Sequence, residues 1–110
     1  MTWLVRDDGE VLASLEVADT MSSRMAGLLG RDGIDGAMLI KPARSVHTMG
    51  MKFALDVAFC DRQLQVLAIR CMVRNRFSLP RLRARCVIEA EAGAFERWGL
   101  KVGDRLEITG

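Results

Sequence analysis

Short apolar runs, each stopped by turn-forming residues, constrain the fold of this 110-residue chain more than any other feature. The run from Thr2 to Arg6 stops at an Asp-Asp-Gly turn at positions 7–9. In the following run, Val11 to Val17, the odd-numbered residues are all apolar, so they share one face of an extended strand. Two such runs around a tight turn predict a β-hairpin.

Further runs also have the length and composition of strands. Leu55 to Cys60 and Leu64 to Val73 flank a turn at Asp61 and Arg62, and they predict a second hairpin. The segment from Arg74 to Arg85 contains asparagine, proline and many arginines, so it predicts a long basic loop. The other expected strands are Ala37 to Lys41, Cys86 to Ala92 and a last strand through Leu106 and Ile108.

One amphipathic helix is expected near the N-terminus, because Asp19 or Thr20 can accept hydrogen bonds from its first free amides. Its apolar residues recur at helical spacing. They are Met21, Met25, Leu28 and Leu29. Gly30 is the expected end of this helix. Gly27 would lie inside it at a cost of about 1 kcal/mol relative to alanine. We therefore expect another element's backbone to pack closely at Gly27.

The whole pattern predicts about seven or eight strands without regular alternation of strands and helices. A second helical turn is expected from Ala94 to Trp98, with Gly99 as its cap. Half of the residues are apolar and 27% are charged, which is typical of a globular domain. We predict a single domain over residues 1–110, mainly β (α+β), as a curled antiparallel β-sandwich or barrel-like sheet with two short helices.

Cysteine usage and the absence of a long apolar segment predict a protein of a reducing compartment. Cys60, Cys71 and Cys86 are odd in number and form neither a disulfide framework nor paired CxxC ligands. They are expected to be buried, inert thiols. The N-terminal apolar run is too short for an export signal. The expected location is the cytoplasm, with no membrane partner and no cofactor.

Charge is distributed unevenly along the chain. Seven arginines and no acidic residue lie between Arg62 and Ile88, although the net charge is only +2. This segment favours a small anionic ligand or an acidic partner protein. No aromatic interleaving or known reading motif accompanies the arginines, which argues against nucleic-acid binding. The sequence leaves the oligomeric state open.

Several chemistry-bearing residues gather between Ser45 and Asp61. On an extended backbone, His47, Met49 and Met51 would point to one side and could bind a soft ion such as Cu(I). The alternative is that the methionines fill the core while His47 is a hydrogen-bonded residue at its rim. A closed zinc site is not expected with a single histidine, and no metal ligand is assigned.

Two acidic residues lie within otherwise apolar strand sequence, Asp56 and Glu89. A buried charge is costly unless it meets a cation or several donors. Lys52, Arg24 and Arg31 are available partners. We predict a noncatalytic binding or accessory domain with a polar pocket for a small anionic or polar ligand. The predicted ligand-binding residues are Arg31, His47, Lys52, Asp56 and Glu89.

Two alternatives to this ligand site remain open. In a hydrolase or lyase, His47 would act as acid or base because its unperturbed pKa lies near neutrality, and Asp56 or Glu89 would orient it. Alternatively, both acids belong to structural ion pairs or face solvent on the polar side of a half-exposed sheet. No catalytic residue is assigned, and the protein is not expected to be an enzyme.

Four ordered blocks resemble the bacterial and archaeal family called domain of unknown function 192. They read SSRMAGLLGRDGI, GAMLI, VHTMGMKFALDVAFCD and VIEAEAGAFERWGLKVGDRLEI, and they span almost the whole chain. The residues that match the family pattern are Arg24, Gly27, Leu28 and Arg31, then Met51, Lys52, Leu55 and Asp56, and finally Glu89, Gly93, Gly99, Gly103 and Asp104. The resemblance implies a small, mainly antiparallel β fold with helical additions and brings no assigned reaction.

Two positions depart from that family pattern. Ala54 stands where a proline is common, and Gly50 stands where many relatives carry a tryptophan. An aromatic wall of a shared pocket is therefore not expected in this chain. Some relatives carry export signals, but no export signal is expected in this sequence.

Overall fold

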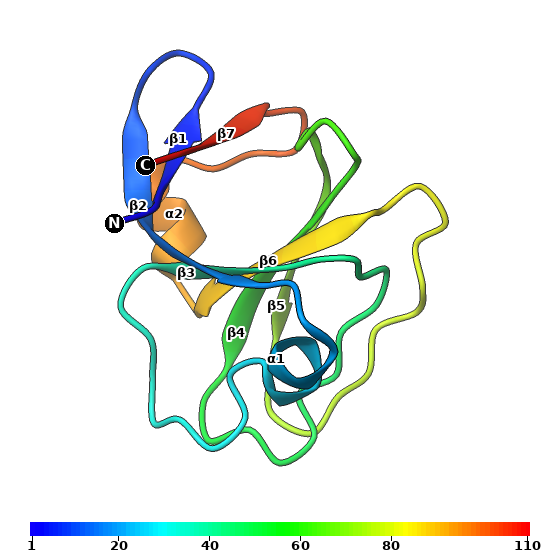
Figure 1. Ribbon diagram of the computed structural model, residues 1–110. Coiled ribbons are helices and arrows are strands. Elements are labelled where there is room, and N and C mark those ends of the chain that lie inside the picture. The colour runs from blue at the N-terminus through cyan, green and yellow to red at the C-terminus, as the bar shows by residue number, and fades with distance from the viewer.

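The computed structural model describes residues 1–110 and contains one curled sheet of seven strands with two short helices (Figure 1). The strands are β1 (Trp3–Arg6), β2 (Val11–Ala18), β3 (Ala37–Ile40), β4 (Leu55–Cys60), β5 (Val66–Met72), β6 (Cys86–Glu91) and β7 (Leu106–Thr109), and the helices are α1 (Met21–Ala26) and α2 (Ala94–Trp98). The strand order is β5-β4-β6-β3-β2-β1-β7. The predicted mainly β fold with two short helices is confirmed. Neither helix is long and apolar enough to cross a membrane.

One pair of strands is parallel, which makes the sheet mixed. β2 and β3 run in the same direction, with Leu15 opposite Ala37 and Ala18 opposite Ile40. All other pairs are antiparallel. Parallel neighbours require a crossover connection, because a two-residue turn cannot return the chain to the start of the next strand. Residues 19–36 make this crossover and carry α1 across one face of the sheet (Figure 1).

The two edges of the sheet meet at one corner without closing a barrel. Val66 donates its backbone N–H to the Asp104 carbonyl at 2.8 Å, and Gly103 donates to the Val66 carbonyl at 2.9 Å. Leu106 donates to the Leu64 carbonyl at 3.0 Å. These bonds join the start of β5 to the turn before β7, while the rest of β5 pairs with β4 alone. The predicted curl of the sheet is therefore present.

The central strands are buried on both faces. In β4, Leu55, Val57 and Phe59 belong to the core on the face crossed by α1, which we call the α1 face. Ala58 and Cys60 belong to the core packed by α2, on the α2 face. Because both faces are covered, every residue of β3 and β4 is buried, and β3 is a continuous apolar run while β4 is interrupted only by Asp56.

Helix α1 begins at a capping box and ends one turn earlier than the apolar spacing predicts. Ser23 donates its backbone N–H to Thr20 Oγ1, and Thr20 donates its own to Ser23 Oγ, each at 3.1 Å. The helix ends at Ala26, because Gly27 follows with φ +47° and leaves the helical path. A Cβ at Gly27 would lie 3.7 Å from Ile40 Cδ1, an ordinary contact. The predicted end at Gly30 and the predicted close backbone approach are both wrong.

The second helix follows the sequence prediction. α2 covers the predicted Ala94 to Trp98, and Gly99 caps its end in the left-handed conformation. Phe95 from this helix packs into the α2-face core.

The predicted basic loop from Arg74 to Arg85 is also confirmed, because it contains no strand beyond one isolated bridge at Phe77.

Two of the three cysteines are buried as predicted, and one is not. Cys60 and Cys86 lie opposite each other on β4 and β6, inside the α2-face core. The neighbouring Cys86 thiol and burial together raise the pKa of the Cys60 thiol. Cys71 on β5 is exposed, because its side of this edge strand is not covered. The prediction of burial is therefore wrong for Cys71.

Thiol labelling should separate these environments. With excess Ellman's reagent at pH 8, the native protein is expected to react rapidly at about one thiol per chain, because reaction requires an accessible thiolate. All three should react after denaturation. The Cys71→Ser variant should lose the fast phase, whereas Cys60→Ser should keep it. A fast phase that survives Cys71→Ser would contradict the burial of the other two thiols.

Candidate functional site

A cavity of about 310 Å³ lies between α1 and the α1 face of the sheet. Its walls come from α1, the residues after α1, segment 42–47 and strands β3, β4 and β6. The polar side chains in the lining include Arg24, Arg44, His47 and Glu89. Apolar residues make most of the remaining wall, among them Met21, Met25, Ile40, Val46, Met51 and Leu55. The volume equals that of about ten water molecules at liquid density.

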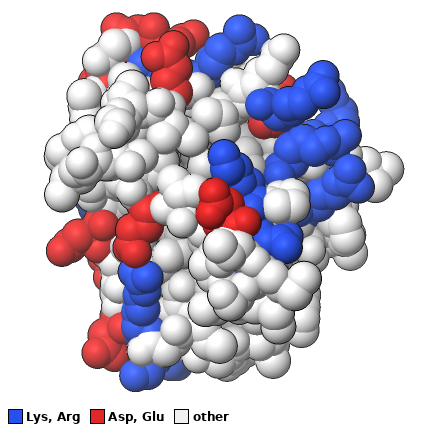
Figure 2. Space-filling view, in the orientation of Figure 1, with Lys and Arg blue, Asp and Glu red and all other residues white.

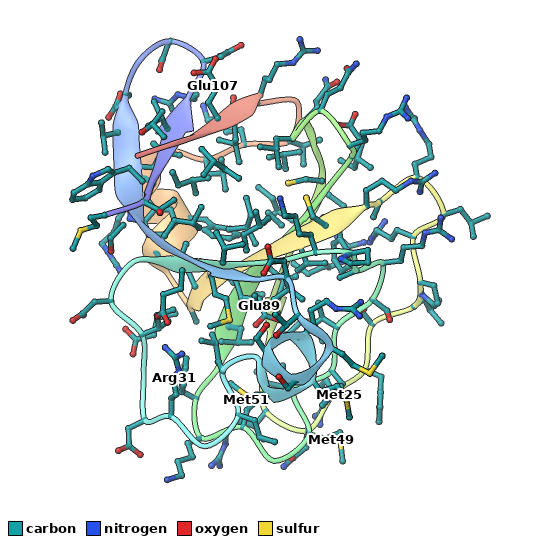
Figure 3. The ribbon with its side chains drawn as sticks, viewed as in Figure 1. Met25, Arg31, Met49, Met51, Glu89 and Glu107 are labelled. Carbon is teal, nitrogen blue, oxygen red and sulfur yellow. The ribbon has the colours of Figure 1, made fainter.

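Glu89 is the buried acid of this cavity. It lies on β6 between Met38 of β3 and Val57 of β4, so its side chain points to the α1 face (Figure 3). The residue is only 4% exposed, and its carboxylate makes no hydrogen bond or ion pair within the protein. Burial raises the pKa of Glu89 to about 7, since the apolar surroundings disfavour the charged form.

Arg24 brings a cation to the same cavity from the last turn of α1. Its Nη1 donates to the Pro42 carbonyl at 3.1 Å, which holds the side chain against segment 42–47. Its Nε is buried without a hydrogen-bond partner. No nitrogen of Arg24 comes within 4.0 Å of the Glu89 carboxylate. The cavity thus contains a donor and an acid that do not satisfy each other.

His47 lies at the exposed rim of the cavity. Its backbone forms an isolated antiparallel bridge with Phe77, and the two rings are 6.0 Å apart. The imidazole makes no hydrogen bond to Asp56 or Glu89. The orienting contact expected for a catalytic histidine is therefore not formed in this structure.

The soft-donor set His47, Met49 and Met51 does not share one side of an extended strand. Met51 donates its backbone N–H to the Thr48 carbonyl at 3.1 Å, and Gly50 has φ +75°, so residues 48–51 form a turn. His47 and Met51 line the cavity, whereas Met49 is 41% exposed outside it. The predicted extended geometry is wrong because the turn reverses the chain between these residues.

The five predicted ligand-binding residues do not converge at one place. The structure brings His47 and Glu89 to the cavity and places the other three elsewhere. Arg31 pairs with Glu16 at 2.7 Å, away from Glu89 in Figure 3, and lowers the pKa of that carboxyl. Lys52 is exposed and lies 3.4 Å from Asp32.

Asp56 is the third residue outside the cavity, because it lies on the opposite face of the sheet from Glu89. In the β4–β6 register, Asp56 is opposite Ala90 and Glu89 is opposite Val57, so the two acids point to different faces. Asp56 Oδ2 accepts the backbone N–H groups of Gly93 at 2.9 Å and Phe95 at 3.0 Å. It therefore fixes the start of α2.

Two charged residues of the cavity, Arg24 and Arg44, lie outside the predicted set. Arg24 had a signal in the sequence, because a buried acid such as Glu89 requires a cation or donors nearby and Arg24 was one of the available cations. Arg44 had no such signal. It reaches the cavity through the path of segment 42–47, which local patterning does not specify.

Comparison with known proteins places this chain among uncharacterized relatives. The model of the DUF192 family, described as uncharacterized ACR, matches residues 3–108. A UPF0127 protein of Pyrococcus furiosus is 29% identical over 103 residues, covering 89% of each chain. A UPF0127 protein of Pyrococcus horikoshii is 28% identical over 105 residues, covering 91% of this chain and 88% of that protein.

Two solved structures share the fold. A protein of unknown function from Novosphingobium aromaticivorans has a TM-score of 0.77 at 22% identity, covering 96% of this chain and 82% of that one. A protein of Sinorhizobium meliloti, described as a candidate transcription regulator, has a TM-score of 0.79 at 25% identity, covering 96% of this chain and 90% of that one. The β-rich architecture is therefore common to these proteins.

The blocks that carry the family resemblance meet at the cavity. Residues that match the family pattern in three of the four blocks contribute to its lining. The contributing residues are Arg24, Gly27 and Leu28, then Met51 and Leu55, and finally Glu89. The fold thus brings distant parts of the resemblance to a single hollow.

Proposed function

Because this chain belongs to the DUF192 family of uncharacterized proteins, we propose its function from the cavity itself: a noncatalytic binding domain that holds a small polar or anionic ligand beneath α1. The observation that carries this proposal is a mainly apolar cavity that holds the buried, unpaired carboxyl of Glu89 beside the half-buried Arg24, whose Nε has no hydrogen-bond partner. Concave apolar sites with a few converging polar groups are typical of ligand binding.

The lining favours a ligand with one anionic end and a short apolar body. The Arg24 guanidinium, which lines the cavity, would pair with an oxyanion, and Arg44 adds positive potential on the same wall. The apolar body would contact Met25 and Met51. Below its pKa of about 7, Glu89 is neutral and can donate a hydrogen bond to the same ligand. A noncatalytic role is favoured because no acid orients His47.

A thermal-shift panel tests this proposal. We expect butanoate, hexanoate or octanoate, or the corresponding alkyl phosphates, to raise the melting temperature by mass action, and hexanol to do so much less. Arg24→Gln should weaken the binding roughly tenfold or more, because a charge-assisted hydrogen bond contributes about 1.5–3 kcal/mol. Binding should also weaken as the pH rises through 7, since ionised Glu89 repels an anion.

The matched control for Arg24→Gln is Arg97→Gln, an exposed arginine on α2 outside the cavity. It should bind like the parent protein. Equal binding by the parent and Arg24→Gln would refute the cavity as the anion site. Native mass spectrometry of the purified protein provides an independent readout, because a retained small molecule adds its own mass to the chain.

A second candidate keeps the soft-ion hypothesis with a changed donor set. His47 and Met51 share the cavity lining with Met21 and Met25, so imidazole and thioether donors surround one hollow. A Cu(I) arm in the same panel separates the two candidates. Stabilisation by Cu(I) that Met51→Leu removes and Arg24→Gln leaves intact would favour this alternative.

The proposal includes a cytoplasmic location. All three cysteines are free thiols, although Cys60 and Cys86 lie directly opposite each other on neighbouring strands. Unpaired cysteines are typical of reducing compartments.

A further inference from the structure

The exposed edge of the sheet lies beside the arginine-rich segment. β5 pairs only with β4, and its second side is occupied only near residues 64–66, at the corner with the turn before β7. Residues 67–72 therefore present an unpaired strand edge, to which another extended chain can hydrogen bond. One bond already made there is local, from Arg70 Nη1 to the Ile69 carbonyl at 3.2 Å.

A groove of about 610 Å³ runs between the end of β5 and the arginine-rich segment. Residues 70–73 form one wall, and residues 76–81 form the other. Phe77 and Leu79 contribute large apolar side chains that are 74% and 86% exposed. An unpaired strand edge thus borders a groove with both apolar and charged walls.

The charge along this groove has one sign. Arg70, Arg76 and Arg81 line it, and none of the seven arginines between Arg62 and Ile88 forms an ion pair. Segment 74–85 runs along one side of the molecule in Figure 1, and Lys and Arg side chains gather on that side in Figure 2. Such a surface attracts a chain of negative charge.

We propose that this groove binds an extended acidic segment of a partner protein, which adds as a strand to the free edge of β5. Backbone hydrogen bonds to residues 67–72 would fix its direction, and acidic side chains would meet Arg70 and Arg76. Apolar side chains on the same face of this strand, two residues from an acid, would contact Phe77 and Leu79, because every second side chain of a strand points to the same side. A bound strand would use the free edge of β5, the positive charge of the groove and its apolar wall together. Nucleic acid would leave the strand edge and Leu79 unused.

Selection from displayed peptides tests this site. We expect a library of octapeptides with Asp or Glu at two alternate positions and random residues elsewhere to enrich on the parent protein, and a matched library with Lys at those two positions not to enrich. The enriched peptide, measured by fluorescence anisotropy, should bind at least tenfold more weakly to Arg70→Glu and Arg76→Glu. Arg97→Glu makes the same change of net charge on α2, outside the groove, and should bind like the parent.

A modified peptide separates strand addition from general attraction of charges. Two variants of the enriched peptide are N-methylated, one at its odd-numbered and the other at its even-numbered residues. Methylation removes backbone donors, so the peptide whose methylated nitrogens face β5 should lose binding. Failure of the acidic library to enrich, or equal weakening by Arg97→Glu, overturns the proposal. So does unchanged binding of both N-methylated peptides, or tighter competition by an oligothymidylate than by the peptide, which would assign the surface to nucleic acid.

Discussion

Glu89→Gln is expected to make the protein more stable than the parent above pH 7, by about 3 kcal/mol in the free energy of unfolding. Glutamine has nearly the same shape as neutral glutamic acid but cannot ionise. The buried carboxyl has a pKa of about 7 in the folded protein, against 4.5 for the unperturbed group. Ionising it inside the cavity therefore destabilises the fold, and the amide avoids this cost.

The pH window follows from these two pKa values. Between about pH 4.5 and 7 the folded state holds the Glu89 proton more tightly than the unfolded state, so the parent loses stability as the pH rises. Below this window both states are protonated, and parent and variant should be nearly equal in stability. Urea denaturation at pH 4.5, 6 and 8 measures the difference.

Glu91→Gln is the matched control, because Glu91 ends the same strand but is exposed. It should follow the pH dependence of the parent. A Glu89→Gln variant that is less stable than the parent at pH 8 would show that the carboxylate is ionised and well partnered. The same variant also tests the cavity, because it should remove the weakening of anion binding above pH 7.

Asp56→Ala is expected to destabilise the protein by roughly 3–5 kcal/mol. The carboxylate accepts two backbone N–H groups at the start of α2, those of Gly93 and Phe95. Removing it leaves both donors without a partner beside the α2-face core, and each unsatisfied buried donor costs about 1–3 kcal/mol. The measurement is the free energy of unfolding from urea denaturation at pH 7.

Asp56→Asn and Glu96→Ala separate the cap from other effects. Asparagine keeps an oxygen acceptor, so Asp56→Asn should lose roughly 1–2 kcal/mol, the difference between charged and neutral acceptors. Glu96 is exposed on the same helix, and its change to alanine should lie within about 0.5 kcal/mol of the parent. If Asp56→Ala lies within 1 kcal/mol of the parent in this comparison, the capping role assigned to Asp56 is refuted.

Sequence patterning predicted the strands because their signals are local. The turn at residues 7–9 and the glycine at Gly99 end their elements wherever these elements lie in the fold. The parallel pairing of β2 with β3 was not predictable in the same way, since it depends on which strand reaches the centre of the sheet. The end of α1 was also missed, because Leu28 and Leu29 continue the helical spacing after Gly27 has left the helix.

The candidate site was predicted only in part, for a topological reason. Asp56 and Glu89 look alike in sequence, as acids flanked by apolar strand residues, and only the register of β4 with β6 sends them to opposite faces. Asp56 therefore caps α2, whereas Glu89 lies in the cavity. Arg24 joins Glu89 because the crossover carries α1 over that face, a contact that no local pattern encodes.

The pairing of β1 with both β2 and β7 has a consequence for the order of folding. The β1–β2 hairpin can form early in synthesis, yet Trp3 must wait for Thr109 before its second neighbour exists. Such nonlocal pairing raises contact order, which slows folding. A nascent chain would therefore expose one side of its first strand until residues 106–109 had left the ribosome, and a chaperone that shields that strand should increase the yield of native protein.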